Sequence, residues 1–197
     1  MTDKRQHLID TAIRLFHERG FWETPTARIA KAAGVANGTL FNYFPTKTDL
    51  IEAVFLGLKS EWVDYLMPED GQALSPREAM RHVWMRAVEW AMAHPQRHAL
   101  LMQMKLSEHV ADAVQADGDA AFEPVLALVR NAQEAGEIRT MPLPLIQSIA
   151  AGQLDATIHY ITQTPEADRS SVAATSFDVF WRGIAAPDGK EDDHDRD

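Results

Sequence analysis

The chain has 197 residues, of which 46% are hydrophobic and 24% are charged, a composition typical of one ordinary globular domain or of one domain with a small appendage. It contains no cysteine, which excludes disulfide frameworks, thiolate zinc sites, iron–sulfur clusters and cysteine nucleophiles. No apolar run approaches the roughly 18 residues that span a bilayer, and the first residues lead into a helical pattern rather than a secretory signal. We therefore expect a cytoplasmic protein.

The net charge of −10 is distributed unevenly along the chain. Residues 1–47, which we call the head, hold seven basic and four acidic residues and so carry a net +3, whereas the rest carries a net −13. An acidic protein with a basic head is a poor general polyanion binder, but its head can still contact nucleic acid. The charge count by itself does not separate this interpretation from ordinary scatter.

Apolar residues recur at helical spacing in residues 4–19, and Gly20 follows in the position where a left-handed residue ends a helix. A second helix is predicted to start with Thr24 as its N-cap and Pro25 in its first turn. Gly34 is predicted to end this second helix. A short turn, Val35-Ala36-Asn37, is predicted after the second helix.

A short third helix is predicted over about residues 37–44, and Pro45 ends it. Thr46, with Asp49 three residues later, resembles a capping box for a fourth helix that carries Trp62. The apolar residues of the third helix are expected on one side: Leu40, Phe41 and Phe44.

The rest of the chain, which we call the body, shows helical periodicity, with no convincing strand and no repeat. Ser75 is expected to cap the helix that begins at Pro76, and Gly118 to separate two later helices. The acidic tail is expected to be disordered. The domains predicted are 1–47 for the head, 48–186 for the body and 187–197 for the tail, and the body helices cover about 76–94, 95–106, 119–135, 142–164 and 167–185. The fold class is all-α, with about nine helices.

Two short helices around a glycine-containing turn form the helix-turn-helix unit that places its second helix in the DNA major groove. Here the polar side of the second of these helices carries Asn37, Gly38, Thr39, Asn42 and Tyr43. Asparagine pairs with adenine through two hydrogen bonds, threonine offers a hydroxyl and a methyl, and glycine lets the backbone approach closely. The pattern also leaves open an αα-hairpin whose polar face meets only water.

Many positions of the head agree, at fixed spacing, with one known family pattern: Leu8-Ile9-Asp10-Thr11-Ala12, Leu15-Phe16-His17-Glu18-Arg19-Gly20-Phe21, Thr24, Ile29-Ala30-Lys31-Ala32-Ala33-Gly34-Val35-Ala36-Asn37-Gly38-Thr39-Leu40-Phe41-Asn42-Tyr43-Phe44-Pro45-Thr46-Lys47 and Leu50. On these residues the head resembles the DNA-binding domain of the tetracycline-repressor (TetR) family of bacterial transcriptional regulators. The match extends over about the first quarter of the chain, whereas the body agrees only in the number and order of its helices.

This resemblance implies a three-helix helix-turn-helix head that binds DNA and a helical body that binds a ligand and forms a homodimer through the last two long helices. The head departs from the family pattern where Ala36 replaces the usual serine, Phe41 replaces a common tyrosine and Ala27 is short. Carried over by position, the implied DNA-binding residues are Thr24, Ala27 and Arg28 near the phosphate-facing start of the second helix, Ala36 in the turn, Asn37, Gly38, Thr39 and Asn42 toward the bases, and Tyr43 and Lys47 at the backbone.

The body is rich in Met and Trp, which favours an apolar cavity for a small, largely hydrophobic effector, although such residues more often fill a core. The expected ligand-binding residues are Trp62, Trp84, Met85, Val88, Met102, Phe122 and His159. Small residues and aromatic anchors suit the last two long helices to dimerisation, namely Ala150, Ala151, Gly152, Ala156, Phe177, Phe180 and Trp181. The pattern also leaves open that these residues face the core of their own chain.

Enzyme patterns are weak in this sequence. His94 and His98 have a metal-compatible spacing, but Pro95 lies between them and no adjacent glutamate supplies a general base. We expect no catalytic residue, no cofactor and no metal site. The function expected is that of a regulator, by resemblance a repressor, that binds a palindromic double-stranded operator as a homodimer and responds to a small molecule. The alternative is a helical ligand carrier or bundle enzyme that does not bind DNA.

Overall fold

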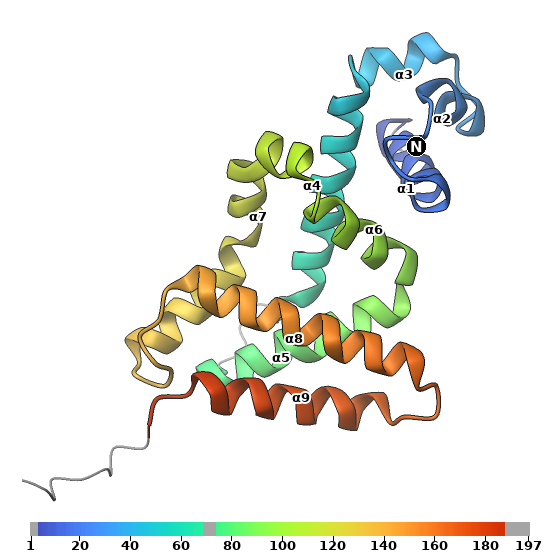
Figure 1. The fold of residues 1–197 in the computed structure, drawn as a ribbon. Coiled ribbons are helices and arrows are strands. Elements are labelled where there is room, and N and C mark those ends of the chain that lie inside the picture. Colours follow the sequence, from blue (N-terminus) through green and yellow to red (C-terminus); the bar gives the residue numbers. More distant parts are fainter. Residues whose placement is uncertain (1–3, 69–73, 188–197) are drawn as a thin grey trace, which may run out of the picture. The chain divides into compact units, whose positions relative to one another are not determined.

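The computed structural model describes residues 4–68 and 74–187, without the side chains at 108, 109, 111–119 and 121. Across these residues the fold is all-α, as predicted, and contains nine helices and no strand (Figure 1). None of these helices has the length and apolar character needed to cross a membrane. The helices are α1 (Lys4–Arg19), α2 (Thr26–Ala32), α3 (Asn37–Tyr43), α4 (Lys47–Leu66), α5 (Pro76–Ala93), α6 (Pro95–Lys105), α7 (Glu108–Glu134), α8 (Leu143–Gln163) and α9 (Arg169–Ile184).

The chain forms two compact units. Unit 1 comprises residues 1–64 and 93–122, and so contains the whole head, nearly all of α4, α6 and the first half of α7. Unit 2 comprises residues 65–92 and 123–197, which include most of α5, the second half of α7, α8 and α9. The tail predicted to be disordered lies, from residue 188 onward, outside the described residues.

The loop between α1 and α2 is built around a buried threonine. Gly20 has φ +82° and ends α1, as predicted. Thr24 is fully buried, and its hydroxyl donates a hydrogen bond to the carbonyl of Gly20 at 2.8 Å. The prediction that Thr24 caps α2 was wrong: the helix begins at Thr26, Pro25 occupies the N-cap position, and no side chain caps it.

Two predicted helix starts are confirmed by their hydrogen bonds. At α4, the Thr46 backbone N–H donates to the Asp49 carboxylate at 2.8 Å, and the Asp49 N–H donates to the Thr46 hydroxyl at 3.1 Å. At α5, the Ser75 N–H donates to the Glu78 carboxylate at 2.9 Å, and the Glu78 N–H donates to the Ser75 hydroxyl at 3.3 Å. Each is a reciprocal capping box, which satisfies two backbone donors with two neighbouring side chains.

The prediction that Gly118 separates two helices was wrong. α7 is continuous from Glu108 to Glu134 and contains both Gly118 and Pro124. A glycine in a helix interior costs only about 1 kcal/mol, and a proline about 3 kcal/mol. A strongly amphipathic helix of this length offsets both costs through the apolar face that it buries.

Helices α8 and α9 pack side by side in unit 2 (Figure 1). The core beneath them contains Trp84 from α5, which stacks on Phe180 at 5.0 Å between ring centroids. Phe177 and Phe180 are 0% and 4% exposed. They therefore fill the core of their own chain, and the expectation that they anchor a second copy was wrong. Helical periodicity had shown that they share a face, but not which neighbour covers it.

Candidate nucleic-acid interface

The turn between α2 and α3 depends on Gly34. This residue has φ +67°, a left-handed conformation that is strained for residues with a Cβ. The N–H of Gly34 donates to the carbonyl of Lys31 at 3.2 Å, and the N–H of Val35 donates to the carbonyl of Ala30 at 3.0 Å. These bonds close the end of α2 and turn the chain directly into α3.

One side of α3 is fixed in the core of the head. Leu40 is 0% exposed and Phe44, directly after the helix, is 2% exposed. Ile29 and Ala30 of α2 are buried as well, and α2 packs against both α1 and α3. Phe41, expected on the buried side, is instead 39% exposed, because it lies about 100° around the helix from Leu40. The inner side of α3 is thus a narrow apolar stripe.

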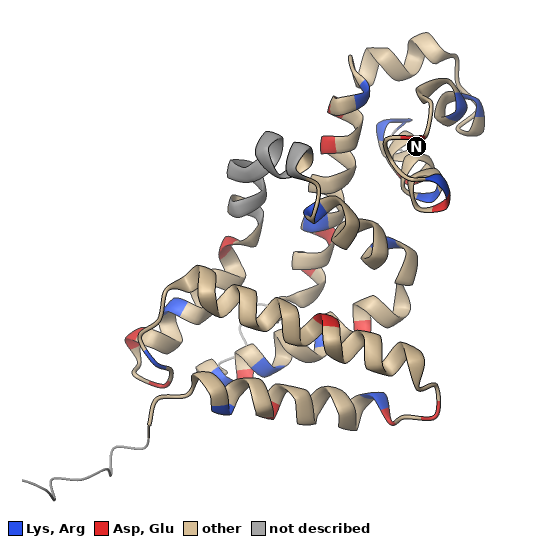
Figure 2. Ribbon diagram, in the orientation of Figure 1, with Lys and Arg blue, Asp and Glu red and all other residues tan. Residues whose placement is uncertain are grey.

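The other side of α3 is polar, uncharged and exposed. Asn37, Gly38, Asn42 and Tyr43 are exposed, and Thr39 is half-buried. α3 itself carries no Lys, Arg, Asp or Glu, so it is drawn entirely in tan in Figure 2. A Cβ placed on Gly38 meets no atom within 4 Å, so nothing in the described part of the chain covers this position. The surface combines amide donors and acceptors, a hydroxyl and an open stretch of backbone.

Basic residues flank this polar face on both neighbouring helices (Figure 2). Arg28 and Lys31 are exposed on α2, and Ala27 lies exposed beside Arg28. Lys47, the first residue of α4, is half-buried, and its ammonium donates a hydrogen bond to the backbone carbonyl of Trp22. Burial lowers the pKa of Lys47, and the nearby Glu23 carboxylate opposes that shift. Uncharged reading groups bordered by cations suit a surface that meets base edges at its centre and phosphates at its rim.

One residue predicted at this site, Thr24, has a different role. The Thr24 hydroxyl donates hydrogen bonds inside the head, to the carbonyl of Gly20 and, at 3.3 Å, to the carbonyl of Leu15. It therefore holds the loop to α1 rather than facing a phosphate. Ala36 is exposed and occupies the N-cap position of α3 without a side-chain hydrogen bond. Asn37 is the first residue of the helix and does not cap it.

The sequence reasoning missed two side chains beside this surface. Trp22 is 44% exposed and supplies the carbonyl that holds Lys47. The guanidinium of Arg5 lies over the ring of Phe44 at 5.3 Å, which places a cation at the end of α3. Two large aromatic residues follow the helix-ending Gly20, and the second of them, Trp22, could have been singled out on that signal. Nothing local in the sequence indicates the contact of Arg5.

The seven predicted ligand-binding residues occupy several environments. In unit 1, Trp62 stacks on Phe122 with ring centroids 5.8 Å apart, and Met102 is half-buried. In unit 2, Trp84 and Val88 are buried in two separate clusters, and Met85 packs against the cluster of Val88. His159 is exposed on α8. Among the residues that the structure describes, the buried indole N–H groups of Trp62 and Trp84 have no hydrogen-bond partner, which marks both as donors with unused capacity.

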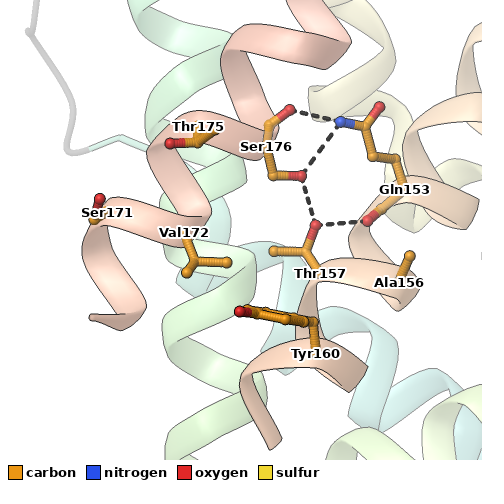
Figure 3. Close-up of a pocket in the computed structure, with 8 residues that line it drawn as sticks. All are labelled: Gln153, Ala156, Thr157, Tyr160, Ser171, Val172, Thr175 and Ser176. Atoms are coloured by element: carbon orange, nitrogen blue, oxygen red, sulfur yellow. Dashed lines mark hydrogen bonds between the residues drawn. The ribbon is translucent and has the colours of Figure 1, made fainter. Parts of the chain in front are cut away.

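A groove of about 390 Å³ lies on the outer surface of α8 and α9 (Figure 3). At its inner edge the Gln153 amide donates to the carbonyl of Ser176 at 2.6 Å, and the hydroxyls of Thr157 and Ser176 lie 2.5 Å apart. Tyr160, 52% exposed, forms one wall of this groove. The described residues contain no group of three side chains arranged to hold a metal ion, and His94 and His98 belong to none.

Residues 8–54 match the family model for bacterial regulatory proteins of the tetR family. A tetR family transcription regulator from Shewanella sp. PV-4 has a crystal structure that is similar over 93% of this chain and 99% of that one, with a TM-score of 0.86 and 33% sequence identity. The regulator AcrR of Shigella flexneri is 27% identical over 158 residues, 76% of this chain and 72% of AcrR. The fatty acid metabolism regulator protein of Bacillus subtilis is 22% identical over 159 residues, 79% of this chain and 81% of that protein.

Proposed function

This chain belongs to the TetR family of bacterial transcriptional regulators, and we propose that it is a repressor that binds a palindromic operator as a homodimer and releases it when a small, largely hydrophobic effector binds. The family consists of DNA-binding regulators rather than enzymes. Membership of this family favours a regulator over the alternative of a ligand carrier or bundle enzyme.

The observation that carries this proposal is the division of α3 into two sides. Leu40 fixes the helix in the head, while Asn37, Gly38 and Asn42 point away from the core and are exposed. An α-helix fits the major groove, and asparagine discriminates adenine by two hydrogen bonds worth about 1–3 kcal/mol. We assign Asn37, Gly38, Thr39 and Asn42 to base recognition, with Ala27, Arg28, Ala36, Tyr43 and Lys47 along the phosphates.

Selection of bound fragments from random duplex DNA would identify the operator. With it, Asn42→Ala should weaken operator binding by about 1–3 kcal/mol while leaving binding to unrelated duplex nearly unchanged. Asn131→Ala, the same change at an exposed position of α7, is the matched control. An equal loss on every duplex would show that Asn42 does not read a base.

One head reads too few bases for useful specificity, and so the proposal requires a second copy. Apolar side chains remain exposed on α8 and α9, including Tyr160 at 52% and Val179 at 59%. The exposed small residues Gly152 and Ala156 leave room for close helix approach. Two copies related by a two-fold axis through this surface would cover the groove of Figure 3 and demand an operator with matching symmetry.

The unpaired indole donors support an effector site in the body. A buried N–H without an acceptor costs about 1–3 kcal/mol, and a ligand that carries an acceptor recovers this cost. Because a relative is named as a fatty acid metabolism regulator, hexadecanoate and hexadecanol are suitable probes, read by tryptophan fluorescence. By linkage, an effector must bind more weakly in the presence of operator. A probe that binds with equal affinity in the presence and in the absence of operator is not an effector. If Trp62 donates a hydrogen bond to the probe, Trp62→Phe should weaken binding of the probe.

A further inference from the structure

One guanidinium connects three helices of unit 1. Arg97, in the first turn of α6, lies with Nη2 3.2 Å from a carboxylate oxygen of Asp10 on α1 and with Nη1 2.5 Å from a carboxylate oxygen of Glu61 on α4. The pairs span 87 and 36 residues of sequence. The Arg97 side chain is 30% exposed. Through these two ion pairs, Arg97 of α6 connects α1, the first helix of the head, with α4.

The position of α1 sets the position of the reading helix. α2 packs on α1, the buried Thr24 ties the intervening loop to α1 at Leu15, and α3 follows α2 through the Gly34 turn. α1 also packs on α6, where Leu100, Leu101 and Met104 are buried. An apolar contact of this kind resists separation but allows sliding and rotation, whereas two hydrogen-bonded ion pairs on one planar group fix a direction.

We infer that Arg97 is a positioning residue for DNA binding: it fixes the orientation of the head against α4 and α6 through Asp10 and Glu61. The inference rests on the proposed binding of a two-part operator by two heads. Recognition of two half-sites requires both reading helices at a fixed separation, and a head free to rotate meets this requirement only part of the time. Arginine suits the role because its fork serves two carboxylates at once, which a lysine ammonium does less well.

The same geometry predicts an order of effects. Arg97→Met leaves two carboxylates facing each other without a cation, so attraction turns into repulsion. Asp10→Asn or Glu61→Gln removes one charge and keeps the other pair. Partly exposed pairs contribute little to folding. The change should therefore appear in operator recognition much more than in the melting temperature.

The test uses the full chain, the selected operator and versions of that operator with the half-sites moved apart by one or two base pairs. Arg97→Met should lower operator affinity by about tenfold and flatten the preference for the native spacing, with binding to unrelated duplex changed by less than about twofold. Arg97→Lys should fall between this variant and the wild type. In the exchanged variant, Arg97→Asp with Asp10→Arg, the guanidinium lies on α1 and faces carboxylates on α6 and α4. Part of the preference for the native half-site spacing should then return.

Arg77→Met is the matched control, because Arg77 forms an ion pair with Asp178 at 3.0 Å between α5 and α9 in unit 2. This variant should keep the affinity and the spacing preference. An Arg97→Met protein that keeps both would overturn the inference. So would an equal loss of binding on all duplexes together with a lower melting temperature, since that pattern indicates a purely structural role.

A second measurement does not depend on knowing the operator. The chain has no cysteine, so Lys31→Cys on the exposed side of α2 introduces one spin label per copy. The distribution of distances between the two labels in the dimer should broaden in Arg97→Met and not in Arg77→Met. An unchanged distribution in Arg97→Met would overturn the inference about Arg97 and leave the proposed function intact. A wild-type chain that is monomeric, or that selects no two-part operator, would overturn the proposed function as well.

Discussion

The ammonium of Lys47 donates a hydrogen bond to the backbone carbonyl of Trp22, which joins the first turn of α4 to the loop before α2. This contact holds a cation at the edge of the polar face of α3, close to Glu23. The head therefore presents a fixed charge beside the exposed, uncharged polar face of α3. A positive charge in this place favours contact with a phosphate over contact with a base.

Lys47→Met should weaken binding to operator and to unrelated duplex by similar factors, because a phosphate contact carries little sequence information. The slope of log affinity against log salt should fall by about one unit. Lys105→Met, which removes an exposed lysine at the end of α6, should leave the slope unchanged. An unaltered slope in Lys47→Met would show that this ammonium stays on the Trp22 carbonyl when DNA binds.

Two glycines of the head should respond in opposite directions to alanine. Gly34 has φ +67°, and so Gly34→Ala should lower the free energy of unfolding by about 1–2 kcal/mol. Gly38 lies within α3 with open space around it, and Gly38→Ala should raise that free energy by up to about 1 kcal/mol. Urea unfolding measures both. Gly38→Ala should also weaken DNA binding if the backbone approaches the groove closely, and a stabilised variant with full affinity would exclude such an approach.

The proposed dimer makes a prediction about the outer surface of α8 and α9. Tyr160→Glu should weaken self-association, because an unpaired charge buried at an interface costs about 3–5 kcal/mol. Sedimentation equilibrium measures the change. Leu106→Glu is a suitable control, since Leu106 is 85% exposed and lies outside both helices. If Tyr160→Glu remains as dimeric as the wild type, the two copies do not meet at the groove of Figure 3.

The cap of α5 predicts a pH dependence of stability. Hydrogen bonds from the backbone N–H and the hydroxyl of Ser75 lower the pKa of Glu78 below its ordinary value of 4.5. A carboxyl group whose pKa is lower in the folded state stabilises the fold above pH 4.5, and this contribution is lost as the pH falls through the folded-state pKa. Glu78→Gln should therefore show a smaller loss of stability on acidification. An identical loss in both proteins would mean that the cap is not retained in solution.

Much of the local structure in the head and at the start of α5 could be predicted from the sequence because its signals lie within a few residues. The glycines at 20 and 34 and the helix caps at Thr46 and Ser75 act over short distances along the chain, so both partners of each interaction are close in the sequence. The helical period also separates the exposed polar side of α3 from the buried Leu40 and Phe44. Phe41, expected on the buried side, is exposed, so the edge of the buried side was not predicted correctly.

Only the tertiary structure shows which residues that are distant in the sequence contact each other. Thr24 is a good helix cap by composition, yet its hydroxyl bonds to a carbonyl nine residues back, at Leu15. Phe177 and Phe180 occupy one apolar face of α9, and only the packing of unit 2 shows that α5 covers it. Arg97 meets Asp10 and Glu61 across 87 and 36 residues. A helical pattern determines which side chains share a face, because backbone geometry is local, but it carries no record of which distant segment packs against that face.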